Sequence, residues 1–268
     1  MHSVNVRRVG RAVRTLARVW QRAFLDALIS PGRFWRMMPE LRRACDAVFH
    51  PGIGDLKTFD FPAEGHVQML DIDGDGGGMP PQDLYALLRI ARWLRPRKIF
   101  EFGTFNGLTS AHLAINTEAE VYTLDLPIDL ATDLAGYGEE DKKLLRHRGQ
   151  IGTFYRSRDV ERRIHQLFGD SRTFDYTPYR AFADLVIVDG CHLFECVMSD
   201  SRHALEILGE RGAILWHDFA NLMDVTRACK RLAREVPIFH VEGTSLALYL
   251  RGIPTPGGGA LEKPLSNL

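Results

Sequence analysis

The residues best suited to chemistry in this sequence are acids, histidines and glycines that follow short apolar runs. Glu101 lies in the first such run, residues 98–102, and a glycine-rich turn, residues 103–107, follows at once. Later apolar runs end in Asp125, in Asp170-Ser171, in Asp189 and in His217-Asp218. Parallel strands bind ligands at their carboxyl ends, so we expect these groups to gather along one edge of a sheet. Each acid could instead only hold a turn, but their order along the chain favours a binding site.

The spacing within the turn indicates a nucleotide-like cofactor and argues against two common ones. A dinucleotide fingerprint has glycines at the first, third and sixth positions, where this chain has Gly103, Phe105 and Leu108. The phosphate-binding loop of nucleotide hydrolases needs a Lys-Ser/Thr pair after its last glycine, and none follows Gly107. The remaining pattern can wrap an amino-acid sulfonium group, with Gly103 leaving room for it. Asp125 suits a ribose, because a carboxylate can accept hydrogen bonds from both hydroxyls.

These landmarks resemble the class I S-adenosylmethionine-dependent methyltransferases. The resemblance implies that S-adenosylmethionine is the cofactor and that Asp170 and Ser171 lie beside its adenine. It implies the following cofactor-binding residues: Glu101, Gly103, Thr104, Asn106, Gly107, Asp125, Asp170, Ser171 and Asp189.

A narrower resemblance rests on residues 188–192 (Val-Asp-Gly-Cys-His), on Asp200 and on residues 216–218 (Trp-His-Asp). These residues are similar to the branch that contains macrocin O-methyltransferase and cephalosporin hydroxylase-like proteins, over about residues 80–250. The branch implies O-methylation of a small-molecule hydroxyl, of a sugar or natural-product type.

Several members of that branch hold a divalent cation between acids at two strand ends. Those acids would be Asp189 and Asp218 here, with Mg²⁺ as a second cofactor. Relatives often have two adjacent acids at the second position, whereas this chain has His217 before a single Asp218. Two carboxylates, with water or His217, would give Mg²⁺ few oxygen ligands, so the resemblance leaves metal dependence open.

A hydroxyl acceptor needs either a general base or a cation that acidifies it. His192 and His217 follow two strand ends, and histidine titrates closest to neutrality. We therefore expect the catalytic residues to be His192, His217 and Asp218, although a histidine in a loop is often only a hydrogen-bonding spacer. A hydroxylase-like enzyme and a catalytically silent binding subunit stay as alternatives, because fold does not determine function.

The elements that must position these residues alternate between strand and helix. Pro81 begins a helix with an apolar stripe, and Pro96 follows its end. The predicted strands cover residues 98–102, 121–125, 164–171, 183–190, 212–216, 237–241 and 245–250. The fold class expected is α/β: a Rossmann-like, mostly parallel seven-stranded sheet with a terminal antiparallel hairpin and an N-terminal helical extension. His240 lies in a closing strand, where we expect a structural role.

The chain divides by composition into four segments. We expect a basic amphipathic helical extension (residues 1–50), a linker (51–80), the methyltransferase domain (81–251) and a Pro/Gly-rich tail (252–268). Residues 71–76 copy the first half of a calcium loop, but Gln82 stands where a bidentate Glu is needed, which argues against calcium. Residues 126–160 form either a lid that brings Tyr155 and Arg156 over the ligand or a surface helix and turn.

The bulk composition limits the partners. The net charge of the 268 residues is zero, which argues against nucleic acid. Four cysteines without a CxxC pair favour reduced thiols and a cytoplasmic location. Residues 1–50 carry ten arginines, and those of the predicted helix lie opposite its apolar residues. Such a helix could cover its own domain or a second subunit in a homo-oligomer, which we expect; membrane contact through residues 1–30 and a transit peptide stay open.

Overall fold

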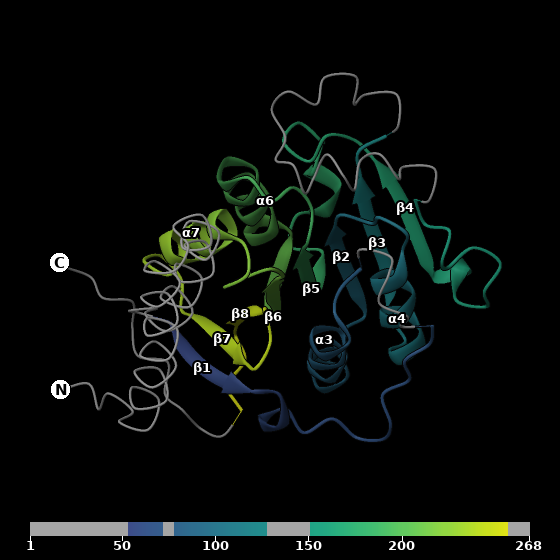
Figure 1. The fold of residues 1–268 in the computed structure, drawn as a ribbon. Helices are drawn as coiled ribbons and strands as arrows, with labels where there is room; N and C mark the ends of the chain where they lie inside the picture. The colour runs from purple at the N-terminus through teal and green to yellow at the C-terminus, as the bar shows by residue number, and fades with distance from the viewer. Residues whose placement is uncertain (1–52, 72–77, 128–150, 257–268) are drawn as a thin grey trace, which may run out of the picture.

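The computed structural model describes residues 53–71, 78–127 and 151–256, and these form one sheet with helices on both faces (Figure 1). The sheet has eight strands in the order β1-β7-β8-β6-β5-β2-β3-β4. The strands are β1 Gly54–Lys57, β2 Lys98–Phe102, β3 Glu120–Asp125, β4 Ile164–Phe168, β5 Ala183–Val188, β6 Leu208–Trp216, β7 Ile238–Glu242 and β8 Ala247–Arg251. The α-helices of these residues are α3 Pro81–Leu94, α4 Leu108–Asn116, α6 Phe194–Ile207 and α7 Met223–Leu232. Within the same ranges, no helix has both the length and the apolar character needed to cross a membrane.

The sheet is parallel except at β8, which runs antiparallel to both β6 and β7. The prediction of a Rossmann-like α/β fold with a closing antiparallel hairpin is therefore confirmed. The strand count differs, because β1 lies in the segment expected to be a linker and pairs in parallel with β7. β1 has only four residues, of which Leu56 alone is buried, so it lacks the apolar run that marks the other strands.

The two faces of the sheet are covered by different helices. Helices α3 and α4 pack on one face and α6 and α7 on the other, as Figure 1 shows. Neighbouring residues of β2 illustrate the alternation, since Ile99 belongs to the core under α3 and Phe100 to the core under α6. Strands covered on both faces read as continuous apolar runs, which is why the sequence predicts them well.

Helix α3 is built as its sequence predicts. Pro81 occupies the first turn, where its missing N–H costs nothing, and Arg95 ends the helix with φ of 52°. The buried face includes Leu84, Leu87 and Leu88. Because this face is fixed on the sheet, the first turn of α3 is held near the C-terminal ends of the strands.

The chain order reverses direction at the centre of the sheet. From β2 the chain adds β3 and then β4 on one side, and afterwards places β5 and β6 on the other side of β2. The carboxyl ends of β2 and β5 therefore flank a topological switch point, where open α/β sheets bind their ligands. The predicted site residues follow these strands and their neighbours.

Candidate functional site

The glycine-rich turn after β2 is shaped by contact with the end of β5. Gly103 has φ of +89°, and a Cβ at this position would lie 2.1 Å from the carbonyl oxygen of Asp189. The backbone N–H of Asp189 donates to the carbonyl of Phe102 at 3.0 Å. Gly103 is therefore needed for the close approach of two strand ends. The sequence analysis gave a different reason for the glycine, namely that it leaves room for the sulfonium part of the ligand.

The second glycine makes room for an aromatic ring. Gly107 has φ of +83°, and an added Cβ would meet the ring of Tyr155 at 2.5 Å. Tyr155 is buried, and its hydroxyl donates to Gln166 Oε1 at 2.7 Å. The turn also accepts backbone hydrogen bonds from Gly152 and Phe154. Tyr155 thus packs beneath the turn as part of the core, which argues against the alternative that it belongs to a lid. Residues 128–150 lie outside the described part of the chain.

Asp125 at the end of β3 holds the same turn from its other side. Its Oδ2 accepts hydrogen bonds from the backbone N–H groups of Thr104 at 2.9 Å and Phe105 at 2.8 Å. Its Oδ1 accepts from the N–H of Leu126 at 2.7 Å. The sequence predicted a ribose-binding acid here. In the structure the carboxylate is a clamp on the turn, which leaves less of its accepting capacity for a ribose.

Two more of the predicted cofactor residues point into the protein. Glu101 is 1% exposed, and its Oε2 accepts from the hydroxyls of Ser110 and Thr123. Burial raises the pKa of Glu101 to about 8. Thr104 is also buried and shares its hydroxyl with Thr123 and Gln166. Both side chains therefore support the turn from below, where a ligand above the turn would not touch them.

Asn106 and the Asp170-Ser171 pair lie in loops at the same edge. Asn106 Oδ1 accepts from the N–H of Leu108, which fixes the start of α4. Asp170 forms two side-chain hydrogen bonds with Arg172, and these, against the effect of burial, hold the pKa of Asp170 below its usual value. The carbonyl of Ser171 accepts from the hydroxyl of Tyr176 at 2.8 Å. The loop after β4 is thus ordered by its own contacts.

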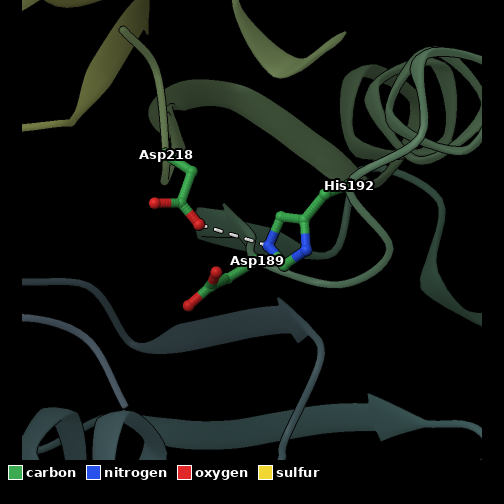
Figure 2. A group of neighbouring side chains, drawn as sticks. All are labelled: Asp189, His192 and Asp218. Atoms are coloured by element: carbon green, nitrogen blue, oxygen red, sulfur yellow. Dashed lines mark ion pairs between the residues drawn. The ribbon is translucent and has the colours of Figure 1, made fainter. Parts of the chain in front are cut away.

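Asp189, His192 and Asp218 come together at the ends of β5 and β6. Figure 2 shows the three side chains pointing toward a common centre. One ligand atom from each lies within 4.8 Å of those of the other two, a spacing that a single cation could bridge. His192 Nε2 is 3.2 Å from Asp218 Oδ2. The sequence named all three residues, but it did not place His192 beside the two acids as a third ligand.

The backbone at Asp218 is strained. Its φ is 59°, and Ala220 two residues later has φ of 69°. Side chains with a Cβ rarely adopt this conformation, and such strain concentrates at functional sites. Burial alone would raise the pKa of Asp218, but the hydrogen bond from His192 and the charges of His217 and His192 hold it below its usual value. Asp218 is therefore an ionised carboxylate held in a costly conformation.

His217 sits between carboxylates on both sides of its ring. Nδ1 lies 2.9 Å from Asp189 Oδ1, and Nε2 lies 3.4 Å from Asp83 Oδ2. Burial alone would lower the pKa of His217, but Asp189, Asp83 and Asp218 together hold it well above its usual value. His217 therefore favours its protonated form, and both of its ring nitrogens face carboxylate oxygens. This geometry argues against the predicted role of His217 as a general base.

Sequence reasoning missed two residues that belong to this arrangement. Asp83 lies in the first turn of α3, where an acid is common for helix stability alone, and Ser245 lies in the turn between β7 and β8. No spacing in the sequence connects either residue with Asp189. His240 bonds through Nε2 to the carbonyl of Thr244 and lies 3.5 Å from Asp55 of β1, so its contacts are structural, as expected.

The residues at the centre of this site match a known protein family. Residues 100–219 match the model of a family described as a methyltransferase domain, and this range runs from β2 past Asp218. The central part of this chain is therefore similar to a methyltransferase domain over the strands that flank the switch point. No curated protein matches the chain.

Several solved structures are similar to this chain at low sequence identity. The SAH-bound methyltransferase PaMTH1 from Podospora anserina is 15% identical with a TM-score of 0.46, over 65% of this chain and 80% of that one. The O-methyltransferase TomG from Streptomyces achromogenes, in complex with SAM, is 18% identical with a TM-score of 0.43, over 67% and 83%. Cofactor-bound Rv0187 from MTB is 17% identical with a TM-score of 0.41, over 66% and 84%.

Proposed function

We propose that this protein is an S-adenosylmethionine-dependent methyltransferase that methylates a hydroxyl group of a small molecule. One observation carries the proposal: the Asp189–His192–Asp218 cluster stands directly against the glycine-rich turn. Asp189 belongs to the cluster, and its carbonyl oxygen would lie 2.1 Å from a Cβ on Gly103. Groups able to activate a hydroxyl thus border the turn expected to hold the methyl donor.

The residues at the switch point suit this cofactor. The turn of residues 103–107, at the N-terminus of α4, would hold its amino-acid part, and Asp170 with Ser171 would lie beside its adenine. Three backbone N–H groups already donate hydrogen bonds to Asp125. Asp125 would therefore accept from the ribose hydroxyls only with its remaining lone pairs. When bound, S-adenosylmethionine supplies an electrophilic methyl group for an in-line displacement, so the protein needs mainly to position the acceptor and remove its proton.

The cluster can remove that proton in two ways. The donor set of two carboxylates and an imidazole fits a divalent cation, and an imidazole nitrogen favours Mn²⁺, Fe²⁺ or Zn²⁺ more than it favours Mg²⁺. A cation held there would lower the pKa of an acceptor hydroxyl. Without a cation, His192 would accept the proton while Asp218, 3.2 Å away, orients its ring. We assign His217 to the support of Asp189 in both versions.

The proposal is tested by binding and by product analysis. Isothermal titration of the full chain with S-adenosylmethionine should show saturable binding, and NAD should show none. Mass spectrometry should then find S-adenosylhomocysteine and a product heavier by one methyl group when hydroxylated small molecules are supplied. Binding of NAD alone would reject the proposal, binding without any methylated product would favour the silent subunit, and a product heavier by one oxygen would favour a hydroxylase.

A matched pair of variants tests the role of the cluster, and removal of metal ions separates the cation from the histidine mechanism. Asp189→Asn removes a charge from the cluster, whereas Asp224→Asn removes the charge of a half-buried acid on α7 that pairs with Arg227 and accepts from the backbone N–H of Phe194. We expect Asp189→Asn to abolish methylation and Asp224→Asn to leave it unchanged. Loss of wild-type activity in EDTA, restored by Mn²⁺, would favour the cation; full activity in EDTA would favour His192.

A further inference from the structure

A continuous chain of buried polar side chains leads from the β7–β8 turn to the candidate site. The backbone N–H of Ser245 donates to Asp83 Oδ1 at 3.1 Å, and the Ser245 hydroxyl donates to Asp83 Oδ2. The same Asp83 oxygen lies 3.4 Å from His217 Nε2. On the other side of the ring, His217 Nδ1 is 2.9 Å from Asp189 Oδ1. The hairpin turn, α3 and the end of β6 are thus linked in series, and His217 at the end of this series contacts one oxygen of Asp189.

Burying these polar and charged side chains costs desolvation free energy. The side chains of Asp83 and His217 are only 1% and 8% exposed. A buried carboxylate is tolerated only when it is paired and hydrogen-bonded, and here Ser245 and His217 supply those partners. Hydrophobic residues of similar size would connect α3 to the sheet at least as stably. A role in the adjoining site therefore accounts for these buried polar side chains better than stability does.

We propose that Ser245, Asp83 and His217 form a brace that fixes the orientation of Asp189, so that its carboxylate is presented to His192 and Asp218. The brace holds Oδ1 of Asp189 through His217 and leaves the other oxygen for the cluster. Asp83 and His217 are then positioning residues, and neither touches the acceptor. This inference rests on the cation site of the proposed function, since a metal ligand is oriented by the hydrogen bonds of its outer partners.

The brace is tested with Mn²⁺ alone, added to the full chain and followed by electron paramagnetic resonance. Asp83→Asn should weaken Mn²⁺ binding by up to roughly 10- to 100-fold, the loss typical when a metal ligand loses its outer partner, because Asp83 holds that partner, His217, in place. Ser245→Ala should weaken binding by a smaller factor, because the backbone N–H of residue 245 still reaches Asp83. The control is Asp55→Asn, which removes an acid that lies near His240 on the other side of the hairpin.

Every result of this experiment bears on the brace. Equal Mn²⁺ affinity of Asp83→Asn and the wild type would overturn it, and so would a wild-type protein that binds no Mn²⁺. If Asp83→Asn does not fold, judged by circular dichroism, Ser245→Ala decides between the two outcomes. A separate titration with S-adenosylmethionine keeps the proposals apart. A protein that binds no S-adenosylmethionine but shows the expected Mn²⁺ pattern would lose the proposed function and keep the brace.

Discussion

The buried carboxyl group of Glu101, beneath the candidate cofactor turn, makes the stability of the protein depend on pH. Burial raises its pKa to about 8, and burial of Asp200 on α6 likewise raises the pKa of that carboxyl to about 7. The unfolded chain loses these protons near pH 4.5 and 3.8, the ordinary values of the two groups. Between the ordinary and the raised values the folded protein therefore binds more protons than the unfolded chain, and its stability falls as pH rises.

We predict that the free energy of unfolding decreases between about pH 5 and about pH 8.5, and that Glu101→Gln makes the decrease smaller. Glutamine keeps an oxygen that can accept from Ser110 and Thr123 but has no proton to lose. One pKa unit corresponds to about 1.4 kcal/mol, so the contribution of Glu101 is a few kcal/mol at most. Urea denaturation at several pH values measures it. Glu118→Gln, at an exposed position, is the control, and parallel curves for wild type and Glu101→Gln would refute the prediction.

Asp125 offers a second test at the level of one residue. Asp125→Ala removes the acceptor of three backbone hydrogen bonds, each worth about 1.5–3 kcal/mol when the acceptor is charged. We expect the turn to loosen and the affinity for S-adenosylmethionine to fall at least roughly tenfold. Isothermal titration gives the dissociation constant, and the exposed Asp159→Ala serves as control. An unchanged constant would show that the turn neither needs this clamp nor holds the ligand through it.

At the scale of elements, the approach of β2 to β5 makes Gly103 irreplaceable. We predict that Gly103→Ala both abolishes cofactor binding and lowers thermal stability, because its methyl group would overlap the backbone of Asp189. Gly243→Ala is a matched control, since Gly243 has φ of +85° and nothing within 4 Å of an added Cβ. The backbone strain of the two variants is therefore similar, and only Gly103→Ala adds the clash. Equal losses of melting temperature in the two variants would contradict the role assigned to the strand contact.

The elements show where prediction from sequence succeeds and where it stops. Strands such as β2 and β5 are mostly apolar because helices cover both faces, so the sequence marks them clearly. β1 was missed because a short edge strand with one buried side chain leaves no such run. The acids at the ends of β5 and β6 follow from the strand pattern. The contact of His217 with Asp83 cannot be predicted in this way, because the packing of α3 on the sheet brings these two residues together.

At the scale of the whole molecule, one prediction concerns the basic N-terminal segment, residues 1–50, which lies outside the described residues. Residues 1–50 carry ten arginines and an apolar stripe with Trp20 and Phe24. We predict that deleting them exposes apolar surface and causes aggregation or a change in oligomer size, measured by light scattering. One amphipathic helix alone binds membranes only marginally. A truncated protein that keeps its mass and loses only liposome binding would instead assign this segment to a membrane.

The pairing of β1 with β7 affects how the molecule assembles. Gly54 pairs with Phe239, 185 residues later in the chain, so this contact closes a far longer loop than the pairing of β2 with β3. Pairings between distant segments generally form late in folding, after local contacts have been made. β1 also contributes one buried side chain, so separating it from the sheet costs little compared with opening the core. We therefore expect the strand that follows the basic N-terminal segment to be added late in folding, and to separate from the sheet more easily than the strands that carry the candidate site.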